Sequence, residues 1–198
     1  MPKEKLFNIL REKVVELQPQ NGEVLLTEPN NRNRPGTLKK VHLVGIPDKA
    51  LVLKPEHATI TVFKEKDPSY NGHNLAKYRR KCDYIIITEF DGIGFILYIE
   101  MKTSARSNEH IAQMWCARSL MEYLNFAIKN LDGLVPAFDE YQHRYVKFTC
   151  IPEDKDTTDM AQEFKTVAKP IIINDKPGSA YPYNVTDGET INLRDLIL

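Results

Sequence analysis

Apolar and polar residues follow two different periods in the first third of the chain. Residues 5–18 place apolar side chains at helical spacing, and Pro19 and Gly22 end this pattern. Three later segments have the composition of strands, and the last of them alternates regularly: residues 23–27, 39–46 and 58–64. We therefore expect a helix followed by several strands in this part of the chain.

The middle of the chain predicts a β-hairpin. Residues 83–88 and 95–99 are rich in β-branched and aromatic side chains, which is typical of buried strands. The pair Asp91-Gly92 lies between them, and this dipeptide favours a tight turn between antiparallel strands. The two segments are therefore expected to pair with each other.

A long amphipathic helix is expected after the hairpin. Ser107 or Asn108 can cap its first turn, and its apolar stripe runs from Ile111 to Ile128. A strand, a helix and a further strand follow in the pattern: residues 144–151, 157–168 and 171–174. This order predicts an α/β fold with a mixed central sheet flanked by helices.

Length and composition describe an ordinary globular chain. Its 198 residues, of which 42% are hydrophobic, suit one domain spanning residues 1–198, and no repeat or flexible linker divides it. Lys and Arg number 27, as do Asp and Glu, and this balance argues against coating of nucleic acid by bulk electrostatics. A local basic groove is still compatible with it.

Three features bear on the compartment. The longest apolar stretch, residues 93–99, is too short to cross a bilayer, and the first residues lack the apolar core of a secretion signal. Cys82, Cys116 and Cys150 fit neither a disulfide framework nor a zinc cluster. We therefore expect a cytoplasmic protein without a membrane partner.

Three charged residues meet at the open end of the predicted hairpin. In an antiparallel pair that turns at residues 91–92, Asp83 comes opposite Glu100 or Met101. Glu100 and Lys102 are two apart on one strand, so their side chains leave the same face. Two neighbouring carboxylates repel unless a divalent cation neutralises them, and oxygen ligands with open water positions suit Mg²⁺ or Mn²⁺. An ammonium group beside that cation can orient a water or stabilise developing negative charge.

This constellation resembles the PD-(D/E)XK nuclease superfamily. The resemblance lies in Asp83, in Glu100-Met101-Lys102 on the next strand, and in a following helix that carries Gln113. It implies a restriction-endonuclease-like core of the order αβββαβ and a Mg²⁺- or Mn²⁺-dependent endonuclease. It assigns Asp83, Glu100 and the Met101 carbonyl to metal binding. Lys102 would assist the attacking water, and Gln113 would lie in the catalytic site.

Two positions depart from the family pattern. Cys82 stands where the family often carries Pro before the first Asp, and Ala117 stands where the RecB-like members carry Tyr. The similarity is therefore greater to small stand-alone members, such as Holliday-junction resolvases and restriction or defence nucleases. The alternative is a catalytically quiet domain of the same fold that binds nucleic acid or a partner protein. In a purely structural interpretation, Glu100 and Lys102 are cross-strand surface charges.

Basic and aromatic residues directly precede Asp83. Arg79, Arg80 and Lys81 can grip phosphates beside the scissile bond, and Tyr78 can stack on a base. Solubilising charges and a half-buried Tyr are the structural alternative. The resemblance favours DNA as the partner, while sequence alone does not separate DNA from RNA. It also suggests a homodimer, or association with an ATPase or another defence or repair subunit.

Three further residues have two interpretations each. Gln113 is either a site residue or an exposed helical Gln. Glu12 and Glu16 lie on the predicted first helix, where some family members place an acidic ligand, yet their helical angles point away from its apolar face. We expect both glutamates to be solvated, and whether either adds to the site is left open.

Overall fold

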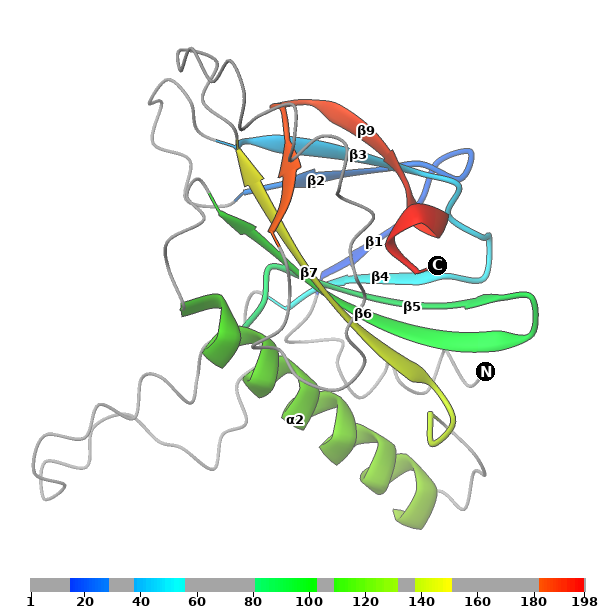
Figure 1. The fold of residues 1–198 in the computed structure, drawn as a ribbon. Helices are drawn as coiled ribbons and strands as arrows, with labels where there is room; N and C mark the ends of the chain where they lie inside the picture. The colour runs from blue at the N-terminus through cyan, green and yellow to red at the C-terminus, as the bar shows by residue number, and fades with distance from the viewer. Residues whose placement is uncertain are drawn as a thin grey trace, which may run out of the picture.

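The structure, a computed structural model, describes the following parts of the chain: residues 15–28, 38–55, 81–102, 109–131, 138–150 and 182–197. Its largest element is a mixed sheet of six strands (Figure 1). They lie in the order β1 (Val15–Leu17), β4 (Leu51–Lys54), β5 (Tyr84–Phe90), β6 (Ile93–Lys102), β7 (Gln142–Cys150) and β8 (Pro182–Val185). Neighbours from β1 to β6 run antiparallel, and β6, β7 and β8 run parallel. The predicted α/β fold with a mixed sheet is confirmed.

A second sheet of three strands covers one face of the first (Figure 1). It contains β2 (Val24–Thr27), β3 (Lys40–Val44) and β9 (Glu189–Asn192), with β3 in the middle. β2 runs antiparallel to β3, and β9 runs parallel to it. The short 3₁₀ helix η3 (Leu193–Leu196) follows β9 and adds two leucines to the core between the sheets. Within the described residues this face is thus covered mainly by strands, where the sequence predicts flanking helices.

The opposite face of the large sheet packs against helix α2 (Glu109–Leu131) (Figure 1). Side chains three and four residues apart form its buried stripe: Met114, Ala117, Met121, Leu124 and Ile128. The predicted helix and most of its apolar face are therefore confirmed, but Trp115, which belongs to the predicted apolar stripe, is 42% exposed. Neither α2 nor any other helix in the described parts of the chain is long and apolar enough to cross a membrane.

Strand β6 is buried on both faces, which explains its nearly continuous apolar sequence. Phe95, Leu97 and Ile99 face the second sheet, whereas Ile96 and Tyr98 face α2. Side chains alternate along a strand, so Glu100 and Lys102 continue the row that faces α2. The open end of the hairpin therefore turns its charged residues toward the helix side of the sheet.

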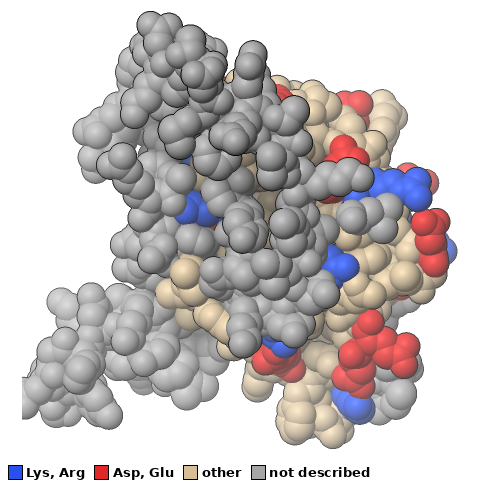
Figure 2. Space-filling view, viewed as in Figure 1, with Lys and Arg blue, Asp and Glu red and all other residues tan. Residues whose placement is uncertain are grey.

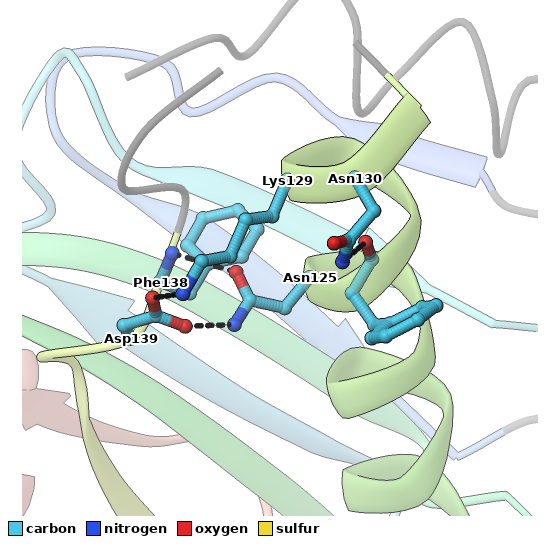
Figure 3. A network of polar contacts seen from close by, with 6 residues as sticks. Asn125, Lys129, Asn130, Phe138 and Asp139 are labelled. Carbon is cyan, nitrogen blue, oxygen red and sulfur yellow. Dashed lines mark hydrogen bonds and ion pairs between the residues drawn. The ribbon is translucent and has the colours of Figure 1, made fainter. Parts of the chain in front are cut away.

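The end of α2 is tied to the segment that leads into β7 (Figure 3). Asp139 accepts a hydrogen bond from Asn125 Nδ2 at 2.7 Å and pairs with Lys129 Nζ at 2.5 Å. The Asn125 side-chain oxygen accepts a hydrogen bond from the Phe138 amide at 2.9 Å. These contacts set the position of the helix along the sheet, because β7 begins only a few residues later.

The predicted hairpin is confirmed, including its turn. β5 and β6 pair from Tyr84 with Ile99 at the open end to Phe90 with Ile93 at the closed end. Asp91 and Gly92 have φ angles of 50° and 79°, which lie in the left-handed region. Tight hairpin turns require such angles, and Asp followed by Gly tolerates them better than most residue pairs.

Other predictions have mixed outcomes. Strands predicted at residues 23–27, 39–46 and 144–151 are confirmed as β2, β3 and β7. The helix predicted for residues 5–18 is wrong at its end, because residues 15–17 form β1 and pair with β4. Pairing with β4 outweighs the helical spacing of apolar residues in this segment, because that spacing is a weak local preference and ends at Pro19 and Gly22. The sequence pattern does not predict β4, and three predicted elements lie outside the described residues: 58–64, 157–168 and 171–174.

Candidate active site at the open end of a hairpin

Asp83 lies immediately before β5, at the open end of the hairpin. The pairing of Tyr84 with Ile99 continues by one step to bring Asp83 opposite Glu100. The Asp83 carboxylate accepts a hydrogen bond from the Met101 backbone amide, with Oδ2 2.7 Å from that nitrogen. The register predicted from the turn is therefore confirmed, and Asp83 is held against the end of β6.

Glu100 and Lys102 form an ion pair at the same end of β6. Lys102 Nζ lies 2.5 Å from Glu100 Oε1. The Glu100 side chain is fully buried, at 0% exposed, whereas 25% of the Lys102 side chain is exposed. The carboxylate thus lies inside and the ammonium group lies toward solvent. A surface pair of charges would have both groups exposed, so the structural interpretation as ordinary surface charges does not fit Glu100.

Burial works against the charged form of both carboxyl groups. It raises the pKa of Glu100 to about 8, with a further rise from the negative Asp83, while Lys102 and the Asp83 amide lower it. Burial also raises the pKa of Asp83, whereas the Met101 amide, Lys102 and Lys54 lower it. Two carboxylates are therefore kept close together in a poorly solvated place. Each would be stabilised by a cation that contacts both.

Lys102 keeps its proton in this arrangement. Burial lowers the pKa of its ammonium group, but Glu100, Asp83 and Glu28 outweigh burial and raise it. Lys102 is therefore a permanent positive charge that can donate hydrogen bonds. It is not an acceptor for the proton of an attacking water.

A second lysine lies beside Glu100 on the next strand. Lys147 pairs with Glu100 across the parallel β6–β7 ladder, and its side chain is fully buried. Burial and the charge of Lys102 lower the pKa of Lys147, while Glu100 raises it. Sequence reasoning did not single out this residue. Lys147 comes to lie beside Glu100 because β7, which follows α2 in the chain, pairs with β6.

Gln113 joins helix α2 to the segment that enters the site. Its Nε2 donates a hydrogen bond to the Lys81 carbonyl oxygen at 3.1 Å, two residues before Asp83. Its Oε1 is buried and accepts no hydrogen bond from any described residue. The structure therefore brings Gln113 close to the segment that precedes Asp83, and its role as a catalytic-site residue stays a prediction. Gln113 is half-buried rather than exposed.

Glu28 is a carboxylate that sequence reasoning missed. It follows β2 directly, and its amide donates a hydrogen bond to the Lys39 carbonyl at 3.0 Å. Burial and the nearby Asp83 raise the pKa of Glu28, whereas Lys102 lowers it. Like Asp83, it is an acidic residue next to an apolar strand. That local signal could have drawn attention to it, but β5, whose Tyr84 contacts the end of β2, lies far away in the sequence.

The remaining predicted site residues are divided between described and undescribed parts. Tyr78, Arg79 and Arg80, which were expected to contact nucleic acid, lie outside the described residues, as does Glu12. Of the basic run, Lys81 is described, and its carbonyl holds Gln113. Met101 buries its side chain in the core between the sheets, and metal binding by its carbonyl stays a prediction. Glu16 is half-buried on β1.

Two residues near the open end of the hairpin carry a buried side-chain oxygen that accepts no hydrogen bond in the described residues: Glu28 (Oε2) and Gln113 (Oε1). Glu100 differs from them, because Lys102 and the Asp83 amide contact its carboxylate. Acceptor oxygens of this kind fit a hard cation such as Mg²⁺ or Mn²⁺. Within the described ranges, no three His, Cys, Asp or Glu side chains are arranged to hold one metal ion. A cation here would therefore keep water or backbone oxygen among its ligands.

Charge on the visible surface is mixed. On the face shown in Figure 2, basic side chains of the described residues stand singly or next to acidic ones, without a broad basic patch. This agrees with the zero net charge of the chain.

Comparisons with protein-family models, with curated proteins and with solved structures found no match. The geometry at the open end of the hairpin is therefore the basis for a functional assignment.

Proposed function

We propose that the chain is a Mg²⁺- or Mn²⁺-dependent nuclease that hydrolyses phosphodiester bonds. The observation that carries this proposal is Glu100, a fully buried carboxylate next to Asp83 and ion-paired with Lys102 at one end of one hairpin. Burying a carboxylate beside another is costly for folding and is typical of functional sites. The acid–acid–lysine set matches the pattern of the PD-(D/E)XK nucleases.

The order of elements supports the same family. β4, β5 and β6 form an antiparallel meander, α2 follows, and β7 returns parallel to β6. This order resembles the βββαβ part of the restriction-endonuclease-like core, and the positions of the acidic residues are compatible with it. We propose that the described sheet is such a core, enlarged by β1, β8 and the three-stranded sheet.

The residues divide the work according to their chemistry. Asp83 and Glu100 would bind the divalent cation, with the Met101 carbonyl as a further ligand. A bound cation would supply positive charge at the phosphate and a polarised water. Lys102, which stays protonated, would orient the attacking water and stabilise negative charge on the phosphoryl oxygens. Gln113 would hold the segment that carries Asp83 and present its free oxygen to the site.

DNA is the proposed substrate, on the strength of the family resemblance. Residues 78–81 would contact phosphates beside the scissile bond, and Lys81 is the described member of that group. A balanced net charge favours a substrate channel completed by a second subunit. The proposed partner is a second copy of the chain, or an ATPase or other subunit of a repair or defence complex.

The test is a cleavage assay on supercoiled plasmid, single-stranded DNA and RNA, each with Mg²⁺, Mn²⁺ or EDTA. We expect cleavage of at least one DNA substrate with Mg²⁺ or Mn²⁺, and none in EDTA. Glu100→Gln should abolish it, whereas Glu140→Gln, a change of the same kind at an exposed position, should not. Cleavage that persists in EDTA, or that survives Glu100→Gln, would contradict the proposal. Preferential cleavage of RNA would correct the substrate.

One observation favours a catalytically quiet domain as the second candidate. Glu100 already has a cationic neighbour in Lys102, at 2.5 Å, and a satisfied ion pair needs no metal. Such a domain would bind nucleic acid or a protein partner without cutting. Absence of cleavage with every metal and substrate, together with metal-independent binding of labelled DNA, would select this function instead.

A further inference from the structure

One side chain joins the second sheet to the start of β5. The Tyr84 hydroxyl accepts a hydrogen bond from the Thr27 amide and donates one to the Thr27 carbonyl, both at 2.7 Å. Tyr84 directly follows Asp83, and Glu28 directly follows Thr27. The same two hydrogen bonds therefore fix the end of β2 against the start of β5, and bring Glu28 to the hairpin.

Acceptor atoms from two separate elements are left without donors near this end of the hairpin. Glu28 Oε2 comes from the end of β2, and Gln113 Oε1 comes from α2. The fully buried Glu100 differs from them, because Lys102 and the Asp83 amide contact its carboxylate. Buried acceptors without donors are rare in folded proteins, because each loses its hydrogen bond to water. Water molecules held by a cation would supply donors to such acceptors.

We propose that Glu28 is a third carboxylate arm of the cation site, and that it contacts the water molecules around the cation rather than the cation itself. This inference rests on the proposed function and adds to it a residue from the second sheet. Direct coordination by three carboxylates does not fit, because no three such side chains in the described ranges are arranged around one point. Mg²⁺ keeps several of its waters when bound to proteins, and those waters need acceptors.

The electrostatics of Glu28 agree with this role. Its pKa is raised by burial and by Asp83 and is lowered by Lys102, so Glu28 interacts electrostatically with both residues of the hairpin site. Asp83, Glu100 and Glu28 share this region with three ammonium groups, those of Lys54, Lys102 and Lys147. Hydrogen bonds from polarised waters would reach Glu28 where a bare cation would not.

The experiment is a calorimetric titration of Mn²⁺ and Mg²⁺ into the full chain and three variants. Glu28→Gln keeps the shape of the side chain and removes its charge, and Glu28→Asp keeps the charge but shortens the arm. Glu23→Gln, an exposed position at the start of the same hairpin of the second sheet, is the matched control. We expect Glu28→Gln to weaken both affinities roughly 10-fold, as substitutions around metal ligands do. Glu28→Asp should weaken them less, and Glu23→Gln should leave them unchanged.

Thermal melts in EDTA and in saturating Mn²⁺ supply the second measurement. Glu28→Gln should melt as the wild type does in EDTA but gain less from Mn²⁺. Equal affinities of wild type and Glu28→Gln would overturn the inference and leave the metal site intact, as would an equal loss in Glu23→Gln. If Glu28→Gln fails to fold, an unchanged affinity in Glu28→Asp overturns it. A wild type that binds neither metal overturns the proposed function itself.

Discussion

An acidic and a basic residue are in contact at each end of the β5–β6 hairpin, but one pair is exposed to solvent and the other is largely buried. At the closed end the basic residue comes from η3. At the closed end, Arg194 lies 3.4 Å from Asp91, with side chains that are 59% and 79% exposed. At the open end, Lys102 lies 2.5 Å from Glu100, which is fully buried. Water screens the first pair, whereas the second pair has little water to screen it. The same kind of contact therefore costs little desolvation at the closed end and much more at the open end, where the proposed site lies.

The largest expected difference between the two ends concerns activity. Lys102→Ala should lower cleavage by roughly 10²–10³-fold, because it removes the positive charge that we propose stabilises the reacting phosphate. Its affinity for Mn²⁺ should persist, since the carboxylates remain. Arg194→Ala at the closed end should leave kcat unchanged. A cleavage assay combined with calorimetry checks this, and parallel losses of metal affinity and activity in Lys102→Ala would show that Lys102 only maintains the site.

A second prediction concerns the pH dependence of stability in metal-free buffer. The pKa of Glu100 rises from about 4.5 in the unfolded chain to about 8 in the fold, so the native state holds this proton more tightly. Its contribution to stability is therefore fully present below about pH 4.5 and is lost as pH rises through about 8. Glu100→Gln should stabilise the fold at pH 8 by on the order of 2–4 kcal/mol. Urea unfolding in EDTA at pH 5 and pH 8 measures this, and equal effects at both values would contradict it.

A third prediction tests the packing that supports the closed end. The Tyr141 ring lies over Gly94, and an ideal Cβ on Gly94 would come within 2.5 Å of that ring. The Tyr141 hydroxyl also donates a hydrogen bond to Glu89. Gly94→Ala should displace the ring and cost about 1–3 kcal/mol in the free energy of unfolding. In a Tyr141→Leu background the cost should shrink, and an undiminished cost in this double-mutant cycle would place the strain elsewhere.

The smallest effect is expected from the exposed pair itself. Arg194→Gln should change the free energy of unfolding by less than about 0.5 kcal/mol, because solvent already screens its contact with Asp91. Chemical unfolding at low and at high salt measures it. A loss above 1 kcal/mol in the free energy of unfolding would mean that solvent exposure does not explain the difference between the ion pairs at the two ends of the hairpin.

The parts of the site that are close in sequence could be predicted, and the distant parts could not. The Asp91-Gly92 turn sets the register of its own strands, so Asp83 and Glu100 follow from counting residues. Glu28 reaches the site through a contact between Tyr84 and Thr27, 57 residues apart, which no local pattern encodes. Lys147 depends on a parallel crossover over α2. The wrong helix at residues 15–17 has the same origin, because β1 exists through its pairing with β4.

The parallel pairing of β9 with β3 has a consequence for the order of assembly during synthesis. β3 supports β2 on one side and receives β9 on the other, and Asp187 accepts hydrogen bonds from the amides of Lys39 and Lys40. The first of these contacts spans 148 residues. The β5–β6 hairpin and α2 are synthesised long before β9, so the three-stranded sheet next to Glu28 is completed last. In a newly made chain, Asp83, Glu100 and Lys102 would thus be available for pairing in the hairpin before the second sheet is complete.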